Sequence, residues 1–119
     1  MTFTEYDMYP VTRQLLRSYY KASDGWELFE QPHGGTYIPD FVLQRRNRNN
    51  QIEKVVVEVK AECRVRQAHI DQLNGYVRNL AGPNVQIVAK LLVFPSGSDI
   101  SLATRLGITV HRLSTFKCI

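Results

Sequence analysis

Two acidic residues and one lysine lie on segments that are expected to form neighbouring strands. Asp40 follows Pro39 near the start of one segment, and Glu58-Val59-Lys60 lies near the end of the next. Successive side chains of a strand point to opposite faces, so Glu58 and Lys60 project from the same face, about 6–7 Å apart along the strand. A carboxylate and an ammonium group at this spacing can act together on one substrate.

The two segments, residues 37–44 and 54–62, predict a β-hairpin around a polar, basic loop. If the hairpin is symmetric about Asn49, Asp40 lies opposite Glu58, with Cβ atoms roughly 5 Å apart. A slip of one residue would place Asp40 opposite a valine instead. The symmetric register also pairs the apolar residues of the two strands, Phe41 with Val57 and Leu43 with Val55.

The chemistry that this arrangement predicts is metal-assisted hydrolysis. Adjacent carboxylates repel each other unless a cation lies between them, and oxygen ligands of this kind suit Mg2+ or Mn2+. Such an ion lowers the pKa of a bound water and stabilises charge on a phosphoryl oxygen. Lys60 could orient the attacking water or offset the developing negative charge. Residue types alone leave a second interpretation open, because exposed strand faces also carry solvated charges and cross-strand pairs.

The elements around the hairpin predict an α/β protein with a mixed central sheet flanked by helices. Helices are expected over residues 4–21, 65–81 and from Ser98 or Asp99 to Gly107, and further strands over residues 26–30, 85–94 and 108–113. The first helix could begin with a capping box of Thr2 and Glu5 or of Thr4 and Asp7. Pro10 either precedes or bends that helix. A turn is expected over residues 31–35, and the apolar segment 85–94 should be buried on both faces.

Composition and charge place the chain among single soluble domains spanning residues 1–119. Hydrophobic residues make up 44% of it and charged residues 22%, which argues against disorder. The net charge of +4 makes nucleic acid a natural partner. No apolar run could span a bilayer and no signal pattern opens the chain, so we expect no membrane and a cytoplasmic location, or the host cytoplasm for a viral gene. Cys63 and Cys118 are expected to be free thiols.

Pro39-Asp40 in one strand and Glu58-Val59-Lys60 in the next resemble the signature of the PD-(D/E)xK nuclease superfamily. In that superfamily the motif lies on a hairpin of an α-β-β-β-α-β core, the restriction-endonuclease-like fold, and the predicted element order matches this core over nearly the whole chain. The resemblance implies that Asp40, Glu58 and the Val59 carbonyl bind Mg2+ or Mn2+, and that Lys60 acts on the water or the transition state. It implies a deoxyribonuclease, while RNA remains open because the chemistry requires only a phosphodiester.

A second motif is similar to one in the RecB-like branch. Gln72-Leu73-Asn74-Gly75-Tyr76 matches the Gln-x-x-x-Tyr pattern that these nucleases carry on the helix after the lysine. Gln72 and Tyr76 share a helix face with His69, and this row could hold the DNA backbone or brace Lys60. The other interpretation is a polar outer helix face. The iron–sulfur cysteines of some RecB-like nucleases are absent.

Relatives often add an acidic residue from the first helix to the metal shell. Glu5 is the best candidate, ahead of Asp7 and Glu30, although an acid there could also simply favour the helix N-terminus. Arg45, Arg46 and Arg48 in the hairpin loop could grip phosphates, or could form a solvated tip.

Two other functions stay open. One is a structure-specific endonuclease similar to archaeal Holliday-junction resolvases, which share the core and the acidic motif. The other is a non-catalytic nucleic-acid-binding module with the same fold. One chain offers one active site, so cutting both strands of a duplex would require a homodimer or repeated visits.

Overall fold

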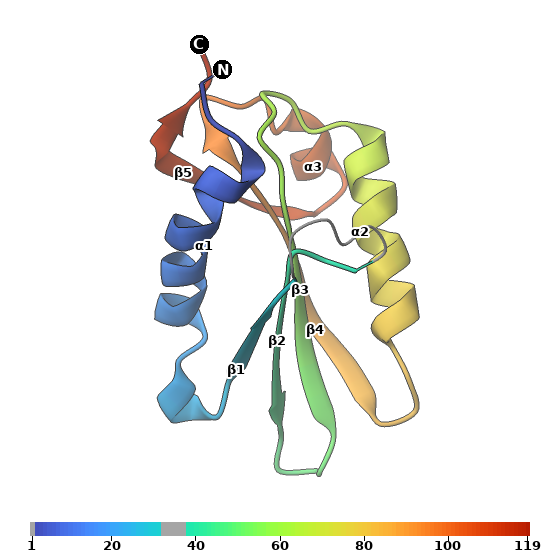
Figure 1. The fold of residues 1–119 in the computed structure, drawn as a ribbon. Helices are drawn as coiled ribbons and strands as arrows, with labels where there is room; N and C mark the ends of the chain where they lie inside the picture. The colour runs from blue at the N-terminus through green and yellow to red at the C-terminus, as the bar shows by residue number, and fades with distance from the viewer. Residues whose placement is uncertain (1, 32–37) are drawn as a thin grey trace.

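The order of elements along the chain is the one that the sequence predicts (Figure 1). The computed structural model describes residues 2–31 and 38–119. The helices are α1 (Glu5–Tyr19), α2 (Gln67–Leu80) and α3 (Ser101–Arg105), with a short 3-10 helix over Ala22–Asp24. The strands are β1 (Glu27–Glu30), β2 (Phe41–Arg46), β3 (Ile52–Val59), β4 (Val85–Ser96) and β5 (Thr109–Lys117). Residues 32–35 of the predicted turn, and Tyr37 at the predicted start of the second strand, lie outside the described residues.

Helix α1 begins at Glu5 because Thr4 caps it. The Thr4 hydroxyl accepts from the Asp7 N–H at 3.4 Å, and the Asp7 carboxylate accepts from the Thr4 N–H at 2.7 Å, which is one of the two predicted capping boxes. Pro10 lies inside the helix and not in a turn before it. The buried side of α1 includes Met8, Tyr9 and Leu16, so Tyr9 faces the sheet.

The five strands form one mixed sheet in the spatial order β1-β2-β3-β4-β5. Strands β1, β2 and β3 pair antiparallel, and β3, β4 and β5 pair parallel. Phe41 pairs with Val57 and Leu43 pairs with Val55, so the predicted register is confirmed. Continued by one residue, this register sets Asp40 opposite Glu58.

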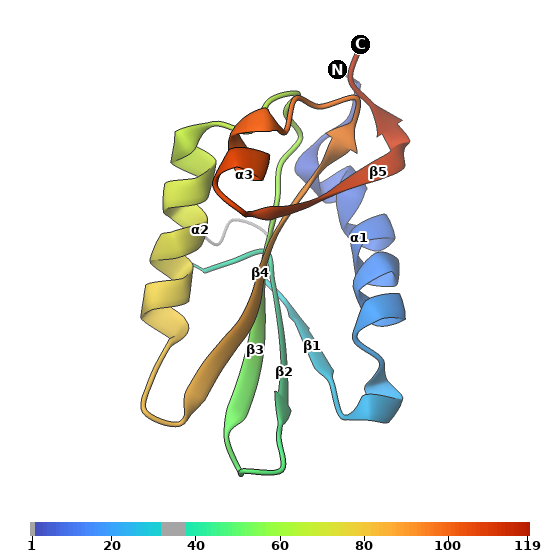
Figure 2. The same ribbon diagram turned by 180° about the vertical axis from the view of Figure 1, so that it is seen from behind.

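Helices cover both faces of the sheet, with α1 on one side and α2 and α3 on the other (Figures 1 and 2). From Val55 onward, β3 is buried on both faces. Val55, Val57 and Val59 pack in the cluster that contains α1 residues, and Val56 packs with α2 residues. Glu58 has the same strand parity as Val56, so it begins on the α2 side. A charged residue is thus placed at the end of a wholly apolar stretch.

The prediction that residues 85–94 are buried on both faces is wrong for the first half of β4. Leu91 to Pro95 are buried, whereas Val88 is 41% exposed. Helix α2 still covers part of this half, because Ile87 packs against the cluster that contains α2 residues and Lys90 Nζ donates to Asn74 Oδ1 at 2.7 Å, whereas Gln86 and Val88 are exposed. The apolar run therefore marks a strand that is fully buried only in its second half.

Cys63 and Cys118 form a disulfide, so the prediction of two free thiols is wrong. Cys63 follows β3 and Cys118 follows β5, with β4 between these two strands. Hydrogen bonds from Asp99 N to Cys63 O and from Cys118 N to Ser96 O hold both segments near the end of β4, and the Cα atoms lie 5.7 Å apart. The cysteines are 55 positions apart in sequence, and only the folding of β3 and β5 around β4 brings them together.

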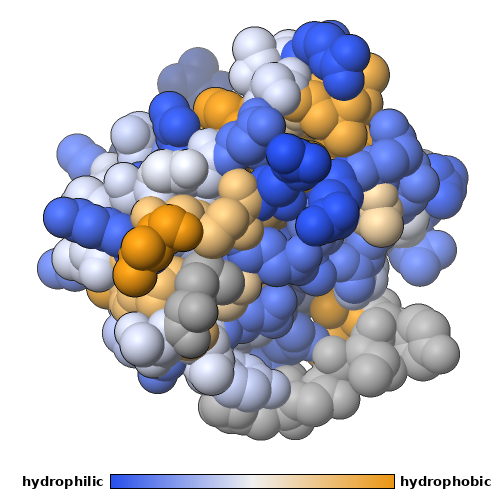
Figure 3. Space-filling view, turned by 90° about the horizontal axis from the view of Figure 1, so that it is seen from above, coloured by the Kyte–Doolittle hydropathy of each residue, from blue (hydrophilic) through white to orange (hydrophobic). Residues whose placement is uncertain are grey.

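The surface at the end with both chain termini is mostly hydrophilic, and its hydrophobic residues form small separate groups (Figure 3). Within the described residues, every helix is too short or too polar to cross a lipid bilayer.

Candidate active site

The two predicted acidic residues meet where β3 ends and β2 begins. The Asp40 N–H donates to Glu58 Oε1 at 2.9 Å, and the Val59 N–H donates to Asp40 Oδ2 at 2.6 Å. Both acidic residues are only 3% exposed. Each carboxylate is thus fixed by a backbone amide of the opposite strand, and the hairpin holds the two acids side by side.

This arrangement disfavours the ionised form of Glu58. Burial, and then the neighbouring Asp40 charge, raise the pKa of the Glu58 carboxyl from its ordinary value to about 8, and Lys60 offsets only part of the increase. Lys60 Nζ lies 3.5 Å from Glu58 Oε2, and its side chain is 14% exposed. Acid, acid and lysine therefore form one compact, largely buried cluster, as the strand alternation predicts.

Two residues that the sequence did not point out also bind Asp40. The Tyr9 hydroxyl donates to Asp40 Oδ1, and Gln31 Nε2 donates to the same oxygen at 2.6 Å. Burial, and then the bond to Asp40, raise the pKa of the Tyr9 phenol. Tyr9 looks like an ordinary core residue on a helix stripe, and Gln31 falls in a predicted turn. No sequence signal identifies either of them, because both contacts span chain segments brought together by folding.

Glu5 is the first-helix acid that lies within electrostatic reach of the cluster. Burial raises the pKa of its carboxyl, Lys60 opposes that increase, and the charges of Asp40 and Glu62 add to it. The two other candidates are engaged elsewhere: Asp7 is part of the α1 capping box, and Glu30 forms an ion pair with Arg13 at 2.7 Å.

Helix α2 brings Tyr76 within electrostatic reach of Glu58, and Gln72 is bonded to Tyr76. Gln72 Nε2 donates to the Tyr76 hydroxyl at 3.0 Å, and Tyr76 is 7% exposed. Burial, and then the charge of Glu58, raise the pKa of the Tyr76 phenol. The two residues of the predicted motif therefore form a hydrogen-bonded pair, and the charge of Glu58 acts on the tyrosine of this pair.

His69 makes different contacts from Gln72 and Tyr76. Its Nδ1 accepts from the Arg66 N–H at 3.0 Å, which caps the start of α2, and its Nε2 lies 2.9 Å from Glu62 Oε2. An Nδ1 that accepts leaves the proton of the neutral ring on Nε2, so His69 donates to Glu62. Both ring nitrogens are engaged in fixing the helix to the segment after Lys60.

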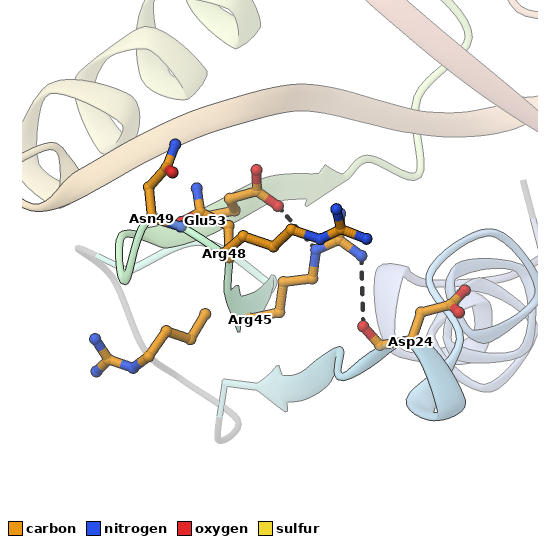
Figure 4. A pocket seen from close by; sticks show the side chains of 7 residues that line it. Asp24, Arg45, Arg48, Asn49 and Glu53 are labelled. Carbon is orange, nitrogen blue, oxygen red and sulfur yellow. Dashed lines mark hydrogen bonds and ion pairs between the residues drawn. The ribbon is translucent and has the colours of Figure 1, made fainter.

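The predicted arginines lie at the other end of the hairpin, about 20 Å from Asp40, because Arg46 is the sixth residue after Asp40 along the strand. They line a surface hollow of about 510 Å³ together with Asp24 and Glu53 (Figure 4). Arg45 donates to Glu53 at 2.8 Å and lies over the Trp26 ring, and Arg46 donates to Asn50. The structure does not bring these side chains to the carboxylate cluster.

The donor chemistry of the cluster fits Mg2+ or Mn2+. In residues 2–31 and 38–119, no three His, Cys, Asp or Glu side chains form a ready-made metal site. Asp40 and Glu58 nevertheless supply two buried carboxylates of the hard type that these ions prefer. Burial, and then the charge of Asp40, raise the pKa of Glu58, and a cation between the two carboxylates relieves that repulsion. Asp40, Glu58 and the Val59 carbonyl are the groups that would hold it.

Comparison with known proteins yields little for this chain. No protein-family model and no curated protein matches it. One solved structure, that of EndoMS in apo form, is similar at 19% sequence identity with a TM-score of 0.41. The match covers 95% of this chain and 47% of that one, so the chain spans about half the length of the matched protein.

Proposed function

We propose that this chain is a divalent-metal-dependent nuclease that hydrolyses phosphodiester bonds of DNA. The observation that carries the proposal is the mutual fixing of Asp40 and Glu58, whose carboxylates are held together by backbone amides although they repel. A module that only binds nucleic acid does not require two adjacent buried carboxylates. A hydrolase that depends on a cation requires them as metal ligands.

The residues of the cluster have different roles in the proposed reaction. Asp40, Glu58 and the Val59 carbonyl would hold the cation, Mg2+ or Mn2+, which would supply an activated water and charge stabilisation for the phosphoryl group. Lys60, with its Nζ at 3.5 Å from Glu58, holds the attacking water or offsets the charge that develops on the phosphate. Glu5 adds a carboxylate from α1 to the surroundings of the cation.

The substrate side of the proposal rests on charge and on α2. The net charge of +4 favours a polyanion. Tyr76 of the bonded pair Gln72–Tyr76 lies within electrostatic reach of Glu58, and the pair would contact the sugar–phosphate backbone next to the scissile bond. This placement favours the RecB-like type of activity.

The test incubates purified protein with labelled single-stranded, duplex and four-way-junction DNA, each with Mg2+, Mn2+ or EDTA. Asp40→Asn removes one metal-binding charge at nearly constant size. The matched control is Asp71→Asn, an acid on the exposed side of α2. We expect cutting that requires metal, disappears in the Asp40 variant and persists in the Asp71 variant.

The substrate that is cut fastest separates the types of nuclease. A strong preference for the four-way junction would replace the RecB-like assignment by a junction resolvase. DNA binding without cutting, equal in EDTA and in Mg2+ and unaffected by Asp40→Asn, would overturn the catalytic proposal and leave a binding module.

A further inference from the structure

The hydrogen bonds around Asp40 divide its two carboxylate oxygens unequally. Oδ1 accepts from the Tyr9 hydroxyl and from Gln31 Nε2, and Oδ2 accepts from the Val59 N–H. A carboxylate oxygen has two lone pairs, so Oδ1 has none left, whereas Oδ2 keeps one with respect to the described residues. Asp40 can therefore offer only Oδ2 to a further ligand as long as Tyr9 and Gln31 stay in place.

Gln31 donates to Asp40 in an orientation that leaves its own side-chain carbonyl without a hydrogen bond from the described residues. A carboxylate only accepts, so the Gln31 amide must turn Nε2 toward Asp40 and Oε1 away from it. Oε1 is buried there, and no donor among the described residues reaches it. The Gln31 N–H also donates to the Asp40 carbonyl at 3.0 Å, so the residue is attached to Asp40 at two points. Buried acceptors are normally hydrogen-bonded, so the bond to Asp40 and not the hydrogen bonding of Oε1 sets the orientation of the Gln31 amide.

Tyr9 reaches Asp40 from the opposite element, α1. Its ring is 5% exposed and packs against Phe41 with ring centroids 5.1 Å apart, so the hydroxyl has little freedom to leave the carboxylate. Two donors from distant parts of the chain, Tyr9 in α1 and Gln31 directly after β1, thus bind one oxygen atom of Asp40.

We propose that Tyr9 and Gln31 are positioning residues that limit Asp40 to one-oxygen binding of the cation, and so make the site select Mg2+ or Mn2+ over Ca2+. The inference rests on the proposed function, because it concerns the same cation. Mg2+ requires near-octahedral geometry at short distances and keeps several waters, whereas Ca2+ takes six to eight oxygens and accepts carboxylates that bind through both oxygens. A carboxylate with one oxygen occupied suits the smaller ion.

Glu58 is fixed as well, although it keeps an open lone pair on each oxygen. Its Oε1 accepts from the Asp40 N–H at 2.9 Å and its Oε2 faces Lys60 Nζ at 3.5 Å, so both oxygens are held in place. The site therefore presents few, fixed oxygens, and the remaining ligands would be waters.

The test measures cation binding and not activity. Titration calorimetry gives the affinities for Mg2+, Mn2+ and Ca2+ of the unsubstituted protein and of Tyr9→Phe, Gln31→Met and the double variant. Tyr9→Phe keeps the ring in the core, and Gln31→Met keeps the length of the side chain without its donor. Tyr20→Phe and Gln44→Met are matched controls, since Tyr20 packs against Trp26 and Gln44 lies in β2 opposite Lys54. Gln31→Asn, with a shorter amide, is a second Gln31 variant, and thermal unfolding checks that each variant folds.

We expect each substitution to weaken Mg2+ binding about 10-fold to 100-fold, the usual effect of removing a group that orients a metal ligand. Ca2+ binding should fall less or rise, so the preference for Mg2+ over Ca2+ drops about tenfold or more in the double variant. The two controls should behave like the unsubstituted protein.

Two negative results are distinguishable with Asp40→Asn in the same titrations. If Asp40→Asn loses cation binding while the Tyr9 and Gln31 variants keep both the Mg2+ affinity and the Mg2+/Ca2+ ratio, the positioning role is overturned and the nuclease proposal stands. If Asp40→Asn binds cations as tightly as the unsubstituted protein, Asp40 is no ligand, and the cation site of the proposed function fails together with this inference.

Discussion

The backbone amide of Asp40 donates to the carboxylate of Glu58 at 2.9 Å, so the hairpin ties together two acids that repel each other. The strand pairing that buries Phe41 against the valines of β3 also forces this contact. Hydrophobic packing thereby stabilises an arrangement that electrostatics disfavours in the metal-free protein, and each prediction about the cluster depends on that balance.

The metal-free protein should become less stable as the pH rises from about 5 through about 8. The pKa of Glu58 is raised from 4.5 in the unfolded chain to about 8 in the folded protein, so the folded state binds the proton more tightly over this interval. The free energy of unfolding therefore decreases with pH until Glu58 is fully ionised. Glu58→Gln, which cannot ionise, should flatten this profile and raise the Tm at pH 8.5 by several degrees. Thermal unfolding in EDTA between pH 5 and 9 measures both effects, and a Glu58→Gln profile as steep as that of the unsubstituted protein would contradict the assignment.

Lys60→Met should separate catalysis from cation binding. Removal of a positive group that acts on the transition state typically lowers kcat about 10²-fold to 10³-fold. Cation affinity should stay equal or increase, because the substitution removes a positive charge 3.5 Å from Glu58. Lys54→Met, earlier on the same face of β3, is the matched control and should change neither quantity. If Lys60→Met weakened cation binding as much as Asp40→Asn does, Lys60 would be part of the cation site's structure and not a group acting on substrate.

Arg48→Ala should weaken DNA binding without changing the chemical step. The hairpin arginines lie about 20 Å from Asp40, which corresponds to about six base pairs of duplex, so they can contact phosphates only away from the scissile bond. Measured in the inactive Asp40→Asn background, the slope of log affinity against log salt should fall by about 0.7–0.9 for each phosphate that the variant no longer neutralises. Arg105→Ala on α3 is the control. An unchanged slope would assign the loop to solvent.

Reduction of the Cys63–Cys118 disulfide should destabilise the fold. The bond closes a loop between positions 55 residues apart, and such a cross-link typically contributes about 2–4 kcal/mol to the free energy of unfolding. Thermal unfolding with and without reductant measures the loss, and the variant with both cysteines replaced by serine should show the same loss without responding to reductant. Alkylation of two thiols in the unreduced native protein would contradict the bond.

The sequence was sufficient for the acidic hairpin because the information there is local. Alternating side chains along β3, the apolar partners in β2 and the length of the loop together predict the pairing of Phe41 with Val57, and with it the meeting of Asp40 and Glu58. The same reasoning failed for β4, where an apolar run predicts burial but cannot predict how much of each face the rest of the protein covers.

Contacts between elements that are distant in the sequence could not be predicted from the sequence. Tyr9 and Gln31 look like a core aromatic and a turn residue, and the cysteines look like two unrelated thiols, because nothing in their spacing encodes which segments meet. The sequence by itself determined the element order, the hairpin register and the acidic pair, since strand periodicity and short-range pairing set these. Only the tertiary structure decided which donors bind Asp40 and that Cys63 reaches Cys118, because packing of α1 and β5 against the rest of the sheet sets those distances.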